Sequence, residues 1–412
     1  MKLDPIGVAV PFFMALIGLE WVISVASKKK VYRLNDTLTD LSCGIGDQLL
    51  GFLAKGTLAF VYIWIYENLR IYTFDASSWV SWVFAMLGVD FFHYWYHRFS
   101  HRTQLGWATH VVHHQSEEYN LAVALRQSWF AKFYSWVFYI PLAYLGVPVE
   151  LYVASYAFNL LYQFWVHTRL INRLPAVFEW VFNTPSHHRV HHAINAKYLD
   201  KNYAGVLILW DRMFGTFEAE VEEPLYGTLK PIQSWSAAWV NVSPCMKLLR
   251  DSLSEERFFD KLTLWARPPG WDTKTARVIQ VPKFPPDGRE YDVNPRRTAM
   301  IYALIQFGPV SLLLTALLLV PDQWPSNVAW IAVVYGFWTL ASVAAIYEQR
   351  SWVRSFEVGR LIGVLAAGLW ILSNYYTTSV IGLVTLGIVV HCYLGLGILA
   401  VTHFAGRPRV TA

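Results

Sequence analysis

Eleven of the thirteen histidines in this chain lie between Asp90 and His192, within a quarter of its 412 residues. Eight of them form three clusters with the spacings H-x3-H, H-x2-HH and H-x2-HH: His97 and His101; His110, His113 and His114; His188, His191 and His192. Residues three or four apart share one face of a helix, so each cluster can present its imidazoles in one direction. Neutral imidazole is a ligand for iron, zinc and copper. The sequence therefore predicts a metal site built from three separate segments.

Eight imidazoles exceed the four ligands of a tetrahedral ion, so we expect two metal ions to share them. Hydrolytic two-metal sites commonly use carboxylate bridges, and no acidic motif lies among these clusters. A neutral, all-imidazole set suits a redox metal that keeps an open position for oxygen. We therefore predict oxidation of a C–H bond with O2 as co-substrate. The spacing alone leaves hydroxylation and desaturation both open.

Three more histidines lie near the clusters. His187 competes with His188 as a ligand, because 187/191 and 188/192 are both pairs four residues apart. His167 ends an apolar stretch from which it could reach the other clusters, so it is a second additional candidate ligand. We expect His93, one turn before His97, to donate a hydrogen bond or fill space.

Ligating imidazoles usually donate their second N–H group to a carboxylate or a carbonyl. Four side chains near the clusters could accept such bonds: Asp90, Glu117, Glu118 and Asn120. The alternative for each is a solvated loop charge or a helix cap. We expect His391 and His403, in and after the last apolar run, to be packing or surface residues.

The elements that must position these histidines are membrane helices. The chain is 55% hydrophobic and 15% charged, with a mean hydropathy of +0.31, whereas charged residues make up about a quarter of ordinary soluble domains. Several uncharged runs approach the roughly 20 residues that span a bilayer. We predict an all-α, polytopic membrane helical bundle with a cytosolic cap that carries the histidine-rich di-metal site. The net charge of +5 requires no nucleic-acid partner.

Four segments follow from the pattern of apolar runs. N-terminal transmembrane helices occupy residues 1–78, the catalytic core 79–225, a cytosolic segment and linker 226–298, and C-terminal transmembrane helices 299–412. The predicted spans are 5–26, 44–66, 79–96, 299–320, 328–346 and two within 361–401. The runs 133–149 and 151–166 fit either a full hairpin or a shallow re-entrant pair.

Basic residues set the predicted orientation. Lys28, Lys29 and Lys30 follow the first apolar run, which argues for a retained span over a cleaved signal and holds that end in the cytoplasm. Arg350, Arg354, Arg360, Arg407 and Arg409 mark the same face among the later spans. The histidine clusters then lie on the cytosolic face, of the endoplasmic reticulum in a eukaryote or the inner membrane in a bacterium. The three distant cysteines form no CxxC pair, so neither a disulfide framework nor a thiolate metal site is expected.

At these residues the sequence resembles the fatty acid hydroxylase and sterol desaturase superfamily of membrane di-iron oxygenases, and within it the branch of the alkylglycerol monooxygenases. The resemblance covers about residues 79–225. Its motifs are 88–90, 94–95, 97–98, 113–114, 117, 119–121, 124–128, 159–165, 167–168, 183–192, 200–205 and 215–218. His93 departs from it, because the close branch carries an aromatic residue there.

The resemblance implies two iron ions and a membrane lipid substrate. Enzymes of this branch oxidise the carbon next to the ether oxygen of a glyceryl ether, and the product falls apart to an aldehyde and a glycerol. The resemblance also implies tetrahydrobiopterin as reductant, for which the chain shows no binding motif.

Two other functions remain open from the sequence. The first is a sterol or fatty-acyl hydroxylase or desaturase of the same superfamily, with electrons from a cytochrome b5-type protein. The second is a non-enzymatic metal transporter or sensor. Transporters place ligands on broken helices near the bilayer midplane, whereas these clusters follow the ends of predicted spans. The oligomeric state is left open.

Overall fold

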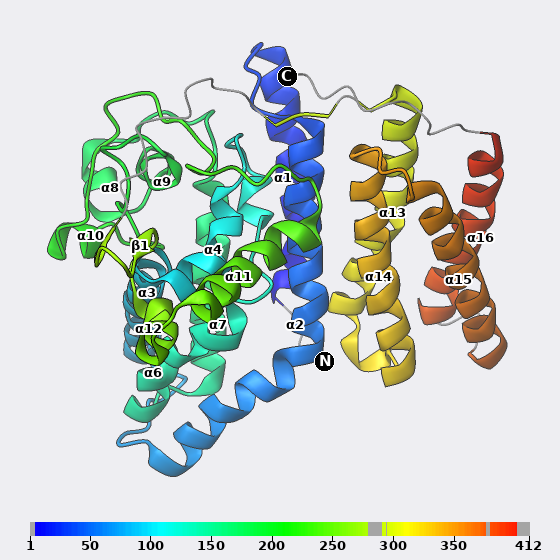
Figure 1. Ribbon diagram of the computed structural model, residues 1–412. Helices are drawn as coiled ribbons and strands as arrows, with labels where there is room; N and C mark the ends of the chain where they lie inside the picture. The colour runs from blue at the N-terminus through cyan, green and yellow to red at the C-terminus, as the bar shows by residue number, and fades with distance from the viewer. Residues whose placement is uncertain (1–4, 279–290, 294, 376–379, 402–412) are drawn as a thin grey trace.

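The protein is described by a computed structural model that covers residues 5–278, 291–293, 295–375 and 380–401 (Figure 1). Its regular secondary structure is almost entirely helical, as predicted. The N-terminal helices and the helices of the catalytic core are α1 Pro5–Ala26, α2 Leu34–Leu69, α3 Trp79–Arg102, α4 Gln104–His114, α5 Lys132–Ser135, α6 Ile140–Leu145, α7 Val149–Trp165, α8 Ala176–Val181, α9 Pro185–His192 and α10 Leu209–Met213. The 3-10 turns η1 Val123–Leu125 and η2 Trp136–Tyr139 also belong to this part.

The remaining elements form a peripheral segment and a C-terminal bundle. The peripheral segment contains α11 Ala237–Ser254, α12 Phe258–Thr263, η3 Leu264–Ala266 and the two-residue strands β1 Trp271–Asp272 and β2 Arg277–Val278. The strands pair antiparallel, with Trp271 opposite Val278. The bundle contains α13 Arg297–Leu319, η4 Pro321–Gln323, α14 Ser326–Tyr347, α15 Val353–Asn374 and α16 Val380–Val401. Residues 279–290 of the predicted linker lie outside the described residues.

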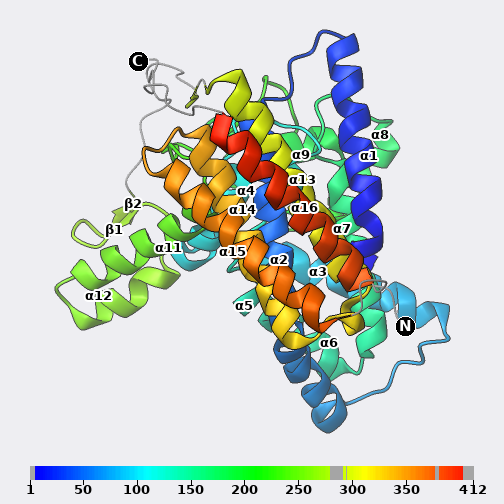
Figure 2. The same ribbon diagram turned by 90° about the vertical axis from the view of Figure 1, so that its right-hand side faces the viewer.

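Helices α1 and α2 stand between the histidine-bearing core and the bundle of α13–α16 (Figures 1 and 2). Helix α2 packs against α13 and α14 on one side and against α6, η1 and α11 on the other. Two glycines allow the close approach on the core side. A Cβ atom on Gly46 would lie 2.4 Å from the Trp129 ring, and one on Gly44 would lie 2.6 Å from the carbonyl oxygen of Leu125. Helix α2 therefore couples the two halves of the molecule.

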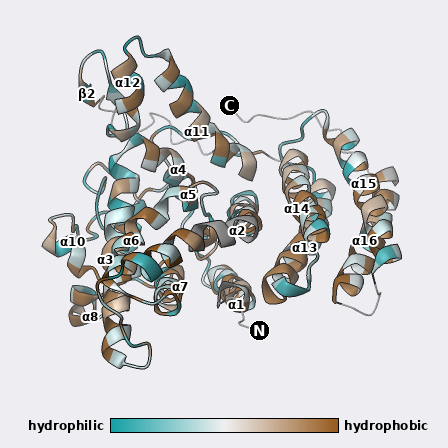
Figure 3. Cartoon of the chain, turned by 90° about the horizontal axis from the view of Figure 1, so that it is seen from below, coloured by the Kyte–Doolittle hydropathy of each residue, from teal (hydrophilic) through white to brown (hydrophobic). Residues whose placement is uncertain are grey.

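Five helices in the described part are long and apolar enough to cross a membrane: Gly7–Ala26, Arg297–Leu319, Ser326–Tyr347, Val353–Asn374 and Val380–Leu399. Hydrophobic residues cover most of α13–α16 (Figure 3). The chain is thus a multi-pass membrane protein. The helices containing the predicted spans 44–66 and 79–96 are not among the five. In α3 the reason is chemical, because its second half carries the buried polar residues Asp90, His93 and His97.

The apolar runs 133–149 and 151–166 do not make a hairpin of two full spans. Residues 132–145 form α5, η2 and α6, none longer than 6 residues, and only α7, with 17 residues, is long. Gly146 ends α6 with a φ of 99°, a left-handed conformation that glycine adopts without strain. The helix lengths therefore argue against the full hairpin.

The bundle of α13–α16 corrects one point of the predicted orientation. Arg360 is fully buried inside α15 and pairs with Glu357 at 2.6 Å. It is therefore not a loop residue that can mark a membrane face. Arg350 lies between α14 and α15 as predicted, whereas Arg407 and Arg409 fall outside the described residues.

Candidate metal centre

Helices α3, α4 and α9 carry the three histidine clusters into one buried space. Thr103 separates α3 from α4, and its hydroxyl accepts the N–H of Gly106 to cap α4. A Cβ atom on Gly106 would lie 2.6 Å from the carbonyl oxygen of Phe99, so only glycine permits this tight corner. Helix α9 begins with Pro185 at its first turn, a position that needs no backbone N–H. All eight residues of α9 are buried or nearly so.

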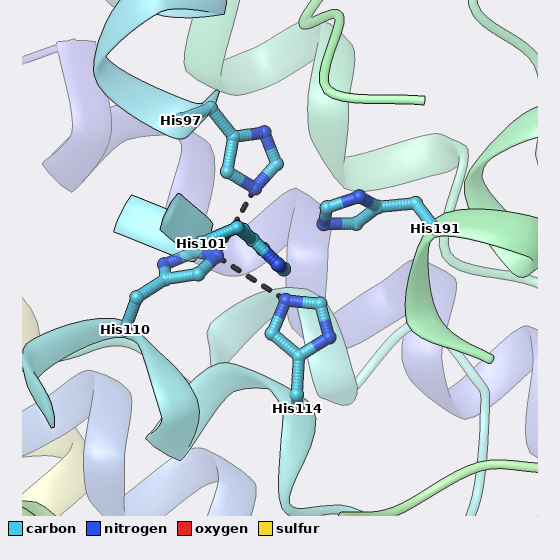
Figure 4. A group of neighbouring side chains, drawn as sticks. All are labelled: His97, His101, His110, His114 and His191. Carbon is cyan, nitrogen blue, oxygen red and sulfur yellow. Dashed lines mark hydrogen bonds between the residues drawn. The ribbon is translucent and has the colours of Figure 1, made fainter. Parts of the chain in front are cut away.

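The imidazoles form two groups, each with ligand nitrogens within 4.8 Å of one another. The first group, shown in Figure 4, consists of His97, His101, His110, His114 and His191. The second consists of His113, His167, His188 and His192. Opposite nitrogens around one ion are about 4 Å apart, since metal–imidazole bonds are about 2.0–2.1 Å long. Each group thus has the dimensions of one coordination sphere.

The two groups adjoin each other through neighbouring rings. His114 of the first group stacks on His192 of the second, with ring centroids 4.4 Å apart. His188 and His191 lie on the same turn of α9, with centroids 5.1 Å apart, and contribute to different groups. The arrangement can therefore hold two ions next to each other.

Within each group the Nε2 atoms face one another. In the first group the Nε2 of His110 lies 3.0 Å from that of His97 and 3.2 Å from that of His114. In the second, His167 Nε2 lies 3.1 Å from His188 Nε2 and 3.3 Å from His113 Nε2. Two nitrogens bound to one ion at right angles would be separated by about 3 Å.

The tautomers show that some of these contacts are not hydrogen bonds. His113 and His167 have Nδ1 atoms 3.2 and 2.7 Å from the carbonyl oxygens of Arg126 and Gln163. A carbonyl oxygen only accepts, so both Nδ1 atoms carry the proton and both Nε2 atoms present lone pairs. Two buried lone pairs 3.3 Å apart repel unless a cation lies between them. The donor set of the second group therefore fits a metal ion.

The first group shows the same need for a cation. His97 donates its Nδ1–H to the carbonyl of Tyr203 at 2.8 Å, and His191 donates to the carbonyl of Lys201 at 3.0 Å. The Nε2 atoms of His101 and His191 are buried and lack a hydrogen-bond partner within the described part of the chain. A buried polar nitrogen without a partner costs free energy that coordination to a metal would recover.

Burial keeps these rings neutral. Desolvation lowers the pKa of His113, His114 and His192 well below the ordinary histidine value, and neighbouring imidazoles lower it further. Desolvation lowers the pKa of His167 to about 4, although its bond to Gln163 opposes the shift. Neutral imidazole is the form that binds a metal, so the site needs no deprotonation step at neutral pH.

Backbone carbonyls accept the second N–H of four of the nine imidazoles, and the predicted side-chain acceptors have other partners. Asp90 accepts hydrogen bonds from Asn159, the backbone of Val206 and Leu207, and the Trp210 indole. Its contacts among the described residues fix the 206–210 segment on α3 and include no bond to an imidazole.

The other predicted acceptors build the loop after α4. Glu117 and Glu118 pair with Arg33 at 2.8 and 3.2 Å. Asn120 donates to the carbonyl of Val31 at 2.6 Å and accepts the N–H of Ala122. These residues attach the start of α2 to the core.

The loop 200–204 provides two of the carbonyl acceptors, a role that sequence reasoning missed. Asp200 and Asn202 adopt left-handed φ values of 59° and 55°, which Asp and Asn tolerate better than most residues. Asp211 accepts the N–H groups of Tyr203 and Ala204, both at 2.8 Å. Backbone carbonyls leave no mark in a sequence, but the Asp200-Lys-Asn202 turn residues were a signal for a tight loop here.

The remaining histidines lie outside both groups. His187 packs edge-on against Phe217, with centroids 5.5 Å apart, so the register 188/192 holds in the second group. His93 lies beside His97 with centroids 5.5 Å apart. His391 lies on α16 of the bundle, far from both groups in the sequence. Its Nε2 atom is 3.0 Å from the Gln306 amide oxygen. His403 lies outside the described residues.

Comparison with known proteins places the site in a family. The Fatty acid hydroxylase family matches residues 82–216, which include all nine grouped histidines. Alkylglycerol monooxygenase of Xenopus tropicalis is 36% identical over 389 residues, 92% of this chain and 84% of that protein. The chain belongs to the alkylglycerol monooxygenase family.

Two further members of the family agree. The Homo sapiens alkylglycerol monooxygenase is 41% identical over a match that covers 74% of this chain and 69% of that protein. The Danio rerio alkylglycerol monooxygenase is 36% identical over a match that covers 87% of this chain and 80% of that protein. No solved structure matches the chain. Membership in the alkylglycerol monooxygenase family makes the chain an oxidoreductase of the oxygenase type. The similarity extends beyond the hydroxylase region on both of its sides.

In this family member a buried ion pair supports the second metal group. The Arg126 side chain donates hydrogen bonds to Asp40 at 2.9 Å and to the carbonyl of Val112 at 2.7 Å, and the carbonyl of Arg126 itself accepts from His113.

The substitution Asp40→Ala leaves the Arg126 charge with weaker compensation and is expected to shift the Arg126 carbonyl. We expect metal affinity of the second group to fall by about 10-fold or more, as for other outer partners of metal ligands. Metal titration of the variant measures it, with the exposed Asp75→Ala as control; unchanged affinity would contradict this role.

Proposed function

We propose that this chain is a di-iron monooxygenase that inserts one oxygen atom at the carbon next to the ether oxygen of an alkylglycerol. The observation that carries the proposal is the pair of buried, neutral imidazole groups, five and four histidines strong. Zinc has no redox chemistry, so a site for oxygen chemistry requires a metal such as iron. The names of the relatives support the ether-lipid substrate.

The reaction balances with an external donor. The ether carbon, O2, two electrons and two protons yield the hydroxylated carbon and water. That carbon then bears both a hydroxyl and an ether oxygen, a hemiacetal, which breaks into an aldehyde and the free glycerol hydroxyl. Iron supplies the oxygen activation when bound.

The chain's own residues orient the metal ligands and exclude water. Four imidazoles are held in one tautomer by carbonyl acceptors, which directs their Nε2 atoms inward. The rings of Trp107 and Tyr203 lie 5.2 and 5.3 Å from that of His101, and Tyr119 lies 5.3 Å from His192. These aromatic neighbours keep the surroundings of the imidazoles largely apolar, which favours an alkyl chain over water.

We also infer that the histidine groups face the cytosol, in the endoplasmic reticulum of a eukaryote or the inner membrane of a bacterium. The lysines at 28–30, directly after α1, support this orientation under the positive-inside rule. Electrons would come from tetrahydrobiopterin or a cytochrome b5-type protein.

Metal removal tests the function. The purified protein is expected to contain about two iron ions per chain, in line with two coordination spheres. A chelator should abolish aldehyde release from an alkylglycerol, Fe(II) should restore it, and Zn(II) should not. A panel with sterols and fatty acyl lipids separates the related activities: oxidation of a sterol with no aldehyde from the ether lipid would replace the proposed substrate.

A further inference from the structure

A polar cavity of about 680 Å³ lies beside the second metal group. The chain after α1, the segment after His167 and the segment after α10 line it, with Lys30, Arg169, Arg173, Glu220, Glu222 and Tyr226 among the contributing residues. Its volume falls within the range of about 300–1,000 Å³ typical of small-molecule sites. The mixture of cationic and carboxylate groups suits a polar, hydrogen-bonding molecule better than an alkyl chain.

Two stacked tyrosines connect this cavity with the metal ligands. The ring of Tyr226, at the cavity wall, stacks on Tyr119 with centroids 4.9 Å apart and an angle of 13°. Tyr119 in turn stacks on His167 at 5.7 Å and meets His192 edge-on at 5.3 Å. Tyr119 is fully buried, and its hydroxyl is fixed by the carbonyl of Val166 at 3.0 Å. The rings of Tyr226 and Tyr119 therefore form a continuous aromatic path from the cavity to the second group.

We propose that the cavity binds the electron donor, a small reduced heterocycle of the pterin class, and that Tyr226 and Tyr119 form the path of its electrons to the second metal group. The inference rests on the proposed function, which requires two electrons from outside for each oxygen inserted. The donor would give up two electrons and two protons. With two metal ions bound by the histidine groups, each ion would take up one electron, and the two protons would leave through the cavity.

Distance decides between a donor site and a substrate site. A reacting carbon must come within about 3–3.5 Å of the group that attacks it. Two ring stacks, of 4.9 and 5.7 Å, lie between the cavity and His167. That separation forbids contact between a substrate in the cavity and the metals, but electrons tunnel across it. A hydride donor is excluded for the same reason, because a hydride must be handed over in contact.

Helix α9, which contributes His188 and His192 to the second group, also reaches the cavity. Arg189, between His188 and His191, pairs with Glu220 at 2.6 Å and donates to the carbonyls of Thr168 and Ile171. These bonds hold the cavity wall rigidly against α9. A fixed wall keeps the separation between donor and metal constant, and a cavity of about 680 Å³ has room for a small molecule but not for a protein donor.

Anaerobic reduction of the iron-loaded, full-length protein tests the path. Tetrahydrobiopterin is mixed with the ferric protein, and the loss of ferric absorption is followed in a stopped-flow instrument. We expect Tyr226→Leu to slow reduction of the iron by about 10-fold or more, which corresponds to a modest rise in the activation free energy. Tyr226→Phe keeps the aromatic ring and is expected to stay near the wild-type rate. Equal rates in Tyr226→Leu and wild type would overturn the path.

Donor binding is measured separately on metal-free protein by equilibrium dialysis with tetrahydrobiopterin. Arg173→Glu is expected to change the affinity several-fold, whereas Lys247→Glu, an exposed residue of α11, is the charge-matched control. Binding that is unaffected by Arg173→Glu, or reduction by a cytochrome b5-type protein alone, would overturn the donor site. If chemically reduced wild-type protein and O2 release no aldehyde from an alkylglycerol in one turnover, the proposed function fails instead.

Discussion

His188→Ala is expected to remove one of the two metal ions and to lower the rate of aldehyde formation by at least about 100-fold. This loss exceeds the usual loss of activity when only a hydrogen-bond partner of a metal ligand is removed. His188 Nε2 lies 3.1 Å from His167 Nε2 and 3.2 Å from His192 Nε2, at the centre of the four-histidine group. Removing it leaves three imidazoles and an opening to one side. The metal content of the purified variant and its turnover of an alkylglycerol measure the effect.

The neighbouring residue provides a matched control. His187 is buried on the same helix, but its ring packs against Phe217 outside both groups. His187→Ala is expected to retain two metal ions and to lose stability only, as a buried ring replaced by a methyl group does. Loss of one metal from His187→Ala, with both retained in His188→Ala, would show that the other register holds. Equal metal content in both variants would argue against a ligand role for His188.

Glu357→Ala is expected to destabilise the C-terminal bundle by about 3–5 kcal/mol, the usual consequence of leaving one partner of a buried ion pair alone. Neither Glu357 nor Arg360 is exposed. The Glu357 carboxylate accepts hydrogen bonds from Tyr302, at 2.6 Å, and from Ser342, and Arg360 reaches Gln306 and Thr339. Without Glu357, a guanidinium charge remains inside an apolar bundle, where an unpaired charge is costly. Thermal unfolding of the purified protein in detergent measures the loss.

Removing both charges separates pairing from packing. The double variant Glu357→Leu, Arg360→Met is expected to recover most of the stability, because apolar residues of similar size often replace a buried ion pair without loss. Its metal content should match the wild type, since the pair lies in the α13–α16 bundle and the histidines in the core. A double variant as unstable as Glu357→Ala would show that the hydrogen-bond network, and not the charge, determines stability here.

Spacing predicted much of the histidine grouping, because residues three or four apart on a helix point the same way regardless of the rest of the fold. His97 with His101, His110 with His114, and His188 with His192 each share one group in the structure. Spacing could not predict that His113 belongs to the second group while His110 and His114, its neighbours on α4, belong to the first. That assignment depends on where α9 and the end of α7 lie relative to α4, which is a matter of tertiary packing.

The hydrogen-bond partners of the imidazoles illustrate the opposite case. Asp90 was a reasonable acceptor by helix position, yet it holds the backbone of Val206 and Leu207. The actual acceptors include the carbonyls of Arg126, Lys201 and Tyr203. Every residue has a carbonyl, so nothing in the side-chain pattern distinguishes these three. Only the folded loops bring them within reach of a ring.

Composition and periodicity by themselves determined the membrane class, the helical architecture and the pairs of histidines that share a helix face, since these depend on local hydropathy and on the pitch of one helix. The tertiary structure alone decided how nine imidazoles divide into groups of five and four, that His167 belongs and His187 does not, and that Arg360 is an internal charge. Those outcomes depend on contacts between segments far apart in the chain, whose relative positions are set by the packing of all the helices together.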